Sequence, residues 1–151
     1  MWHTTMATTT LFSNSEEHPG YYLWQTAMRW QKEMNQVLNE YSLTYTQYII
    51  LFTIHRLKNE QNPISQVTIA SVCNIDTMMV SKVLKTLIKK ALVTRKESKI
   101  DTRSKIVTLT PSGESTLLTA NVAIESAEEV FFQSLGNFSD SFYSALEQLS
   151  L

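Results

Sequence analysis

The sequence predicts a mainly α-helical protein with one small β-hairpin, an α+β fold with the element order α-α-α-α-β-β-α-α. Apolar residues recur at steps of three and four over most of the chain, which is the periodicity of amphipathic helices. The chain of 151 residues contains only three Gly and three Pro, which favours long helices and few tight turns. Two stretches rich in β-branched residues, 92–96 and 105–109, flank a polar segment and predict the hairpin.

Two helices are predicted in the first third of the chain. The second begins after Thr44, whose hydroxyl has the spacing of a capping box with Gln47, and runs to about Lys58. Its run of bulky apolar residues over 48–52 predicts that this helix is buried on all sides. The first helix, over 21–40, is indicated by apolar residues at helical spacing: Leu23, Ala27, Trp30, Met34, Val37 and Leu38.

Two shorter helices separated by a tight turn are predicted next. Ser65 caps the first of them, Asn74 reverses the chain because Asn tolerates the left-handed conformation, and Asp76 caps the second, over 77–90. At about 100° per residue, this second helix has an apolar face and an opposite face made of Met78, Lys82, Lys85 and Lys89. A cationic helix placed after a helix and a three-residue turn is typical of the recognition helix of a helix-turn-helix.

Two more helices are predicted after the hairpin. The first begins at Thr110-Pro111, because Thr suits the cap and Pro the first helical position, and a break at Gly136-Asn137 separates it from the second. Residues 1–20, rich in Thr and Ser, are expected to form a flexible tail, and 21–151 a single domain.

Positive charge is concentrated in the middle of the chain. Eleven of the thirteen Lys and Arg residues lie between Arg56 and Lys105 together with four acids, a net charge of +7. The flanks carry two cations and ten acids, a net charge of −8, so the overall value of −1 conceals a basic segment. A polyanion such as nucleic acid is the commonest partner of such a segment, although a solvated Lys-rich face has the same composition.

Other classes of function find little support in the sequence. The chain has no metal-ligand spacing, nucleophile elbow, phosphate loop or paired carboxylates, so we expect no cofactor, no metal and no catalysis. The single cysteine, Cys73, is interpreted as a small hydrophobe, with a redox sensor as the alternative. No apolar stretch reaches the length of a membrane span and no signal peptide is evident, which predicts a cytoplasmic protein without a membrane partner.

Three motifs make the chain, from about Tyr21 onward, resemble the MarR family of winged-helix transcription regulators. They are the helix-to-helix link over 38–48, the helix-turn-helix over 64–82, and the segment Asp101-Thr102-Arg103-Ser104-Lys105 with the following residues to Gly113, which is similar to the family's wing. Ala91 and Asn74 stand where many members have Gly. We expect neither to disturb the fold, because the first position requires only a helix end and Asn is a usual substitute in the second.

The resemblance implies a DNA-binding lobe over about 44–110 and dimerisation helices over about 21–40 and 111–151. Arg103 is expected to enter the minor groove from the wing, with Asp101 orienting it. The recognition helix is expected to face the major groove and the preceding helix to touch backbone oxygens. The full set of predicted DNA contacts is Ser65, Gln66, Thr68, Thr77, Met78, Ser81, Lys82, Lys85, Asp101, Arg103 and Lys105. Lys89 and Arg95 are expected to lie too far along their elements to reach the DNA.

The resemblance also implies a homodimer on double-stranded DNA and a ligand-responsive repressor. A small aromatic or phenolic effector could bind near aromatic residues of the first two helices: Tyr22, Trp24, Tyr45, Tyr48 and Phe52. Core packing explains these side chains equally well. The alternative to DNA binding is a winged-helix module that presents its basic face to an acidic protein partner.

Overall fold

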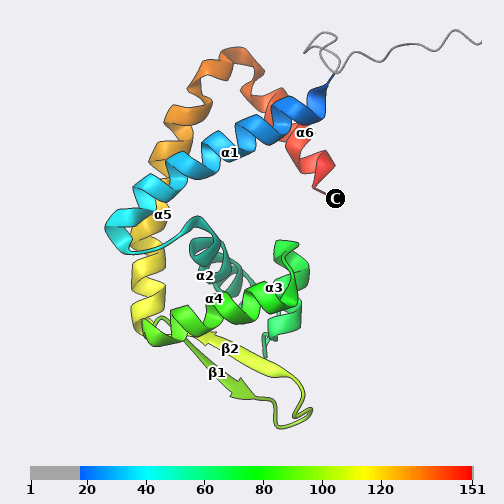
Figure 1. Ribbon diagram of the computed structural model, residues 1–151, viewed down its shortest axis with the longest axis vertical. Helices are drawn as coiled ribbons and strands as arrows, with labels where there is room; N and C mark the ends of the chain where they lie inside the picture. Colours follow the sequence, from blue (N-terminus) through cyan, green and yellow to red (C-terminus); the bar gives the residue numbers. More distant parts are fainter. Residues whose placement is uncertain (1–17, 151) are drawn as a thin grey trace, which may run out of the picture.

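The computed structural model describes residues 18–150 and confirms the predicted order of elements (Figure 1). The elements are α1 (Pro19–Leu38), α2 (Tyr45–Leu57), α3 (Gln66–Cys73), α4 (Thr77–Lys89), β1 (Val93–Glu97), β2 (Lys105–Leu109), α5 (Pro111–Phe132) and α6 (Ser139–Leu149). Short 3-10 turns, η2 (Asn39–Tyr41) and η3 (Gln133–Phe138), follow α1 and α5. Helix α1 begins two residues before the predicted start because Pro19 suits a first turn. The rest of the predicted tail, residues 1–17, lies outside the described residues.

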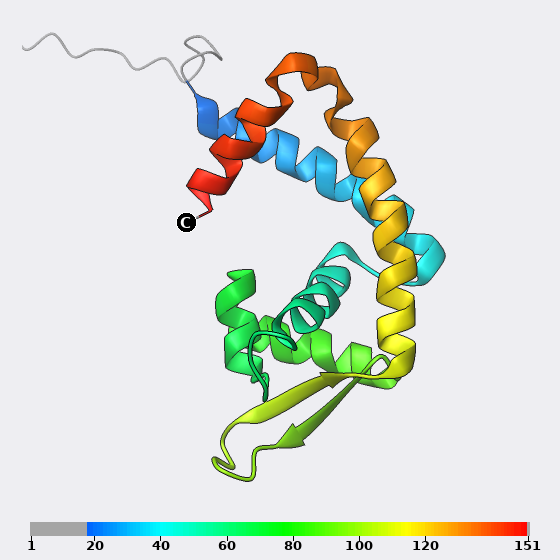
Figure 2. The ribbon, with the colours of Figure 1, turned by 180° about the vertical axis from the view of Figure 1, so that it is seen from behind.

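The molecule has two lobes connected by α5. Helices α2, α3 and α4 and the hairpin form one of them, the winged-helix lobe, and α1, the end of α5 and α6 form the other, the upper lobe (Figures 1 and 2). The two strands pair antiparallel, with Val93 opposite Leu109 and Glu97 opposite Lys105. The loop between them projects away from the helices at the far end of the winged-helix lobe (Figure 2).

The hydrophobic core lies mainly in the winged-helix lobe, where α2 is the central helix. Phe52 departs from the predicted complete burial of α2, since it is 38% exposed. It lies beside an opening next to α5, and the prediction was wrong there because composition does not show which side of a helix its neighbours leave open. The largest fully buried side chains are Met34, Leu38, Ile50, Leu51, Ile54, Ile69, Val80, Leu84, Leu87, Val93, Val107 and Leu117.

The predicted caps and turn form as expected. Thr44 Oγ1 accepts from the Gln47 amide at 3.2 Å, and Gln47 Oε1 accepts from the Thr44 amide at 3.1 Å, which completes the capping box. Asp76 Oδ1 accepts from the Met78 amide at 2.8 Å, and Asn74 has the left-handed backbone, with φ 52°. Each of these features depends on residues a few positions apart, so local sequence was sufficient to predict them.

The backbone at Ala91, just after the end of α4, differs from the expectation that this position requires only a helix end. This residue also adopts the left-handed conformation, with φ 58°, so the position needs more than a helix end and a Cβ is strained there. The tight reversal lets the amide of Leu92 bond to the carbonyl of Leu87, and the hydroxyl of Thr110 donates to the Ala91 carbonyl at 2.7 Å.

The start of α5 is packed against this same reversal. Gly113 is buried, and a Cβ added to it would lie 1.9 Å from the carbonyl oxygen of Leu92. Glycine is therefore required there by the close approach of two backbones. The contact fixes where α5 leaves the winged-helix lobe, and with it the position of the upper lobe.

Within residues 18–150, no single helix is long and apolar enough to cross a membrane. Helices α3 and α4 reach the length and apolar composition of a membrane span only when they are taken together, and they are bent by 114° at their junction.

Candidate nucleic-acid interface

Helices α3 and α4 have the geometry of a helix-turn-helix. The bend of 114° lies within the range of about 90–120° that is typical of the motif. The two predicted faces of α4 are confirmed: Val80, Leu84 and Leu87 are buried, whereas Met78 is 81% exposed. Lys82, Lys85 and Lys89 are exposed as well, so α4 presents a cationic side away from the core.

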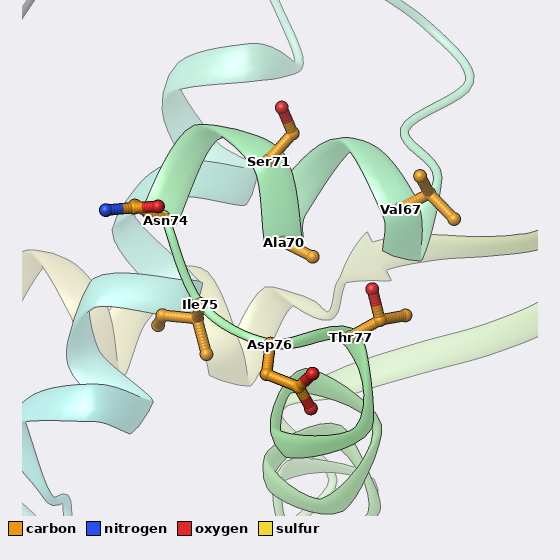
Figure 3. Close-up of a pocket in the computed structure, with 7 residues that line it drawn as sticks. All are labelled: Val67, Ala70, Ser71, Asn74, Ile75, Asp76 and Thr77. Atoms are coloured by element: carbon orange, nitrogen blue, oxygen red, sulfur yellow. The ribbon is translucent and has the colours of Figure 1, made fainter.

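An open hollow of about 500 Å³ separates α3 from the first turn of α4 (Figure 3). Val67 and Ser71 lie on the α3 side, and Asp76 and Thr77 on the opposite side. The carboxylate of Asp76 accepts from the first amides of α4, so it serves as the helix cap. The predicted contact residue Thr77 is exposed at this helix start, whose first amides are already bound by Asp76.

The polar residues at the start of α3 bind one another. The hydroxyls of Ser65 and Thr68 are 2.8 Å apart, and Ser65 Oγ accepts from the Thr68 amide at 3.1 Å. The β-bridge between Ser65 and Ile106 attaches this turn to β2. The predicted contacts Ser65 and Thr68 thus have structural partners within the chain in addition to any contact with a phosphate.

Arg95 is the main residue of this surface that sequence reasoning missed. Its Nη1 donates to Gln66 Oε1 at 3.2 Å and lies 3.4 Å from Ser81 Oγ, so β1 is connected to both helices of the helix-turn-helix. The expectation that Arg95 does not reach the DNA stays a prediction, but its side chain contacts two of the predicted DNA-contact residues. Strand periodicity was the available signal: Arg95 shares a strand face with buried Val93 and pairs with buried Val107.

The wing loop is organised around Asp101. Its Oδ1 accepts from the main-chain amide of Arg103 at 3.0 Å, and Ser98 Oγ accepts from the amides of Ile100 and Asp101. Asp101 therefore shapes the turn that presents Arg103, acting through the backbone and with no ion pair to the guanidinium in the described residues. Ile100 is 95% exposed at the same tip.

The cations of the basic segment divide into two groups. Lys58 pairs with Glu114 at 2.6 Å, Lys105 pairs with Glu97 at 2.9 Å, and Lys90 donates to the carbonyl of Ser42. In the part of the chain that the structure describes, a second group of exposed cations takes part in no ion pair: Arg56, Lys82, Lys85, Lys89, Lys96, Lys99 and Arg103. Six of these seven lie on α4, β1 and the wing loop, and Arg56 lies on α2.

A second feature is a cavity of about 250 Å³ between α2 and α5, which we call the α2/α5 cavity. Three of the five predicted effector residues line it: Tyr45, Tyr48 and Phe52. The other two, Tyr22 and Trp24, lie on the first turns of α1, 45% and 61% exposed, and are not among its lining residues. The rest of the lining is Ile49, Asn121, Ile124, Glu125 and Glu128.

The chemistry of this cavity is aromatic and acidic. The Tyr48 hydroxyl donates to Asn121 Oδ1 at 2.6 Å, and Asn121 Nδ2 donates to Glu125 Oε1 at 2.8 Å. Burial raises the pKa of the Glu128 carboxyl, and the negative charge of Glu125 raises it further. Burial also raises the pKa of Tyr48 to about 12, so the phenol is a neutral hydrogen-bonding group. The sequence could not reveal these acids as part of the cavity, because they lie more than 70 residues from Tyr48.

Comparison with known proteins decides the family. A family model described as "Transcriptional regulator SarA/Rot" matches residues 32–118, more than half of the chain. The chain belongs to this family. The SarA/Rot-type chain is also 29% identical over 148 residues to "Uncharacterized HTH-type transcriptional regulator YdcH" of Bacillus subtilis (strain 168), a match that covers 98% of this chain and 96% of that one.

Solved structures of MarR-family regulators share the fold. The repressor CouR bound to a 23-mer DNA duplex is similar at a TM-score of 0.80 and 25% identity, over 90% of this chain and 94% of that one. A MarR-family regulator from Rhodococcus sp. RHA1 matches at a TM-score of 0.80 and 18% identity, over 92% and 96%. The predicted resemblance to the MarR family is confirmed, and the SarA/Rot-type chain is a DNA-binding transcriptional regulator, not an enzyme.

Proposed function

We propose that the protein is a repressor that binds a pseudo-palindromic operator as a homodimer and leaves it when a small aromatic or phenolic effector binds. The observation that carries the proposal is the position of the cations without an ion-pair partner in the described residues, most of which lie on the exposed side of α4 and on the wing. A helix and a hairpin that project from one lobe can reach the major and the minor groove of one duplex. The similarity to CouR, solved with a DNA duplex, supports the same partner for this chain.

The predicted contacts on α4 and the wing have different proposed roles. Met78, Ser81, Lys82 and Lys85 face the major groove and its walls, Arg103 enters the minor groove, and Lys105 supports the wing. Gln66 and Ser81 are aligned by Arg95, which makes Arg95 a positioning residue. Since DNA is the partner, we infer that the protein acts in the cytoplasm, where bacterial DNA is found.

The proposed dimer is supported by apolar side chains on the upper lobe that the described chain leaves uncovered. On α1, Leu23 and Trp24 are 57% and 61% exposed, and at the other end Phe138 and Leu149 are 75% and 78% exposed. Exposed apolar surface of this kind marks an interface, and two-fold symmetry is the commonest way to bury it. We therefore assign α1, α6 and much of α5 to dimerisation and residues 44–110 to DNA binding. Half-sites then lie about 10 base pairs apart.

Titration with DNA at several salt concentrations tests the proposal. Duplex from the region upstream of the chain's own gene should bind more tightly than random duplex of equal length, and both affinities should fall steeply with salt. Equal affinity for the two duplexes at every ionic strength would contradict operator recognition.

The second candidate is a winged-helix module that binds an acidic protein through the same basic face. It is favoured by the same unpaired cations, since they would equally attract a carboxylate-rich surface. The duplex titration separates the two, because a protein-binding module has no reason to distinguish an upstream duplex from a random one.

A further inference from the structure

We propose that the effector of the α2/α5 cavity is a small aromatic cation, such as a benzylic amine or a quaternary ammonium compound, and not an aromatic acid. The inference rests on the proposed function, because it assigns a charge to the effector of that same site. It is carried by the geometry of the cavity walls, which are aromatic on one side and acidic on the other.

The aromatic wall comes from α2. The rings of Tyr45 and Tyr48 have centroids 5.7 Å apart, and those of Tyr48 and Phe52 lie 6.1 Å apart, so the three rings follow one another along the helix. Trp30 of α1 packs edge-on against Tyr45, with centroids 4.5 Å apart, and supports the first ring. The faces of aromatic rings attract cations and also pack well against another ring.

The acidic wall comes from α5. Glu125 and Glu128 are three residues apart and therefore lie on one side of that helix, facing the cavity. Among residues 18–150 neither carboxylate has a salt-bridge partner, and none of the eight lining residues is Lys, Arg or His. An aromatic acid would add a third negative charge to this site, whereas a cation would supply the missing counter-charge.

Size restricts the ligand further. A volume of about 250 Å³ is below the range of roughly 300–1,000 Å³ that is typical of sites for drug-sized ligands. The cavity therefore suits a compound with one ring and a short cationic arm, with the ring beside Phe52 and the cation near Glu128.

Binding should also move a proton. The Glu128 carboxyl has a raised pKa because of burial and of Glu125, the Tyr45 and Tyr48 hydroxyls stay protonated, and no basic side chain lines the cavity. A bound cation favours the ionised carboxyl, so binding should release protons and strengthen as pH rises through the raised pKa of Glu128. An anionic ligand would show the opposite trend.

Calorimetry on the full chain without DNA tests the charge preference directly. Three probes share one ring and differ in charge: benzyltrimethylammonium, benzyl alcohol and benzoate. Benzyltrimethylammonium should bind about tenfold more tightly than benzyl alcohol, and benzoate should bind most weakly. Benzoate binding as tightly as the ammonium probe, or more tightly, would overturn the inference.

Two matched variants locate the binding. Glu128→Gln keeps the shape of the side chain and removes the charge, and should weaken the ammonium probe by about tenfold with little change for benzyl alcohol. Glu129→Gln is the control, because Glu129 is exposed and does not line the cavity. Equal effects of the two variants would also overturn the inference.

Release from DNA is measured separately, so that the two proposals can fail independently. Operator DNA that is released by benzoate and not by the ammonium probe would refute the cationic effector and leave the repressor proposal standing. Ammonium binding that depends on Glu128 without any release of operator DNA would establish the ligand class and refute regulation through this cavity.

Discussion

The two lobes of the protein differ in how completely they cover their apolar side chains. In the winged-helix lobe, α2 alone contributes six buried residues: Tyr48, Ile50, Leu51, Thr53, Ile54 and Leu57. In the upper lobe, α6 has no buried residue, and the buried residues of α1, Met34 and Leu38, lie in its last turns. The winged-helix lobe is thus packed within one chain, whereas the described chain leaves much of the apolar surface of the upper lobe uncovered, and we propose that a second copy covers it.

Exposed apolar residues have different meanings in the two lobes. In the winged-helix lobe Met78 and Ile100, the most exposed apolar side chains, lie on the same two elements as exposed cations, which suits contact with thymine methyls or a groove wall. In the upper lobe the exposed apolar residues lie on α1, α5, η3 and α6, without any cation of the basic segment. The first pattern suits a nucleic-acid surface and the second a protein interface.

The largest expected effect on stability comes from disrupting the close contact between Gly113 and Leu92, where α5 leaves the winged-helix lobe. Gly113→Ala should destabilise the protein by about 3 kcal/mol, because its Cβ would overlap the Leu92 carbonyl and push α5 away. Urea denaturation followed by circular dichroism measures the loss. Gly20→Ala on α1 is the control, since nothing lies within 4 Å of its new Cβ, and a similar loss in both variants would refute the contact.

The second prediction separates the upper lobe from the winged-helix lobe. The double variant Leu23→Asp, Leu149→Asp should give a folded monomer and weaken operator binding about a hundredfold, because the two half-sites then bind separately. Sedimentation and DNA titration measure these effects. Val72→Asp, a charge placed on an exposed apolar residue of α3, should leave the dimer intact, and an unchanged dimer in the double variant would contradict the assignment.

The third prediction concerns the wing. Arg103→Ala should weaken operator binding by about 1 to 3 kcal/mol, leave the dimer intact and lower the salt dependence by about one phosphate contact. Lys32→Ala, which removes an exposed cation from the upper lobe, should have no comparable effect. Unchanged affinity in the Arg103 variant would remove the wing from the mechanism.

The fourth prediction is a stabilisation of the winged-helix lobe. Ala91→Gly should raise the free energy of unfolding by about 0.5 to 1 kcal/mol, because relief of the left-handed strain exceeds the greater chain entropy of glycine. Thermal unfolding provides the measurement. A lower melting temperature in this variant would show that the strain is absent.

The smallest expected effect is a pH dependence of stability that arises at the α2/α5 cavity. The folded-state pKa of Glu128 is raised above its unfolded value, so the folded protein binds more protons, and this carboxyl reduces stability as pH rises through that folded pKa. Glu128→Gln should therefore gain stability over the native chain at pH 7 and lose that gain near pH 4. An equal difference at both pH values, measured in urea, would exclude this linkage.

The sequence by itself determined the order of the elements, the caps at Thr44 and Asp76, the turn at Asn74 and the two faces of α4. These depend on helical periodicity and on hydrogen bonds between residues close in the chain. The same periodicity identified three lysines of α4 that have no ion-pair partner in the described structure, Lys82, Lys85 and Lys89.

Only the tertiary structure decided which distant residues share a site. It brought Arg95 between α3 and α4, placed Glu125 and Glu128 opposite Tyr48, and showed that Gly113 must lack a side chain because of Leu92. It also left Tyr22 and Trp24 outside the lining of this cavity, although the sequence had grouped them with Tyr45, Tyr48 and Phe52. These relations depend on how helices pack across long stretches of chain, and periodicity within one element contains no information about its neighbours in space.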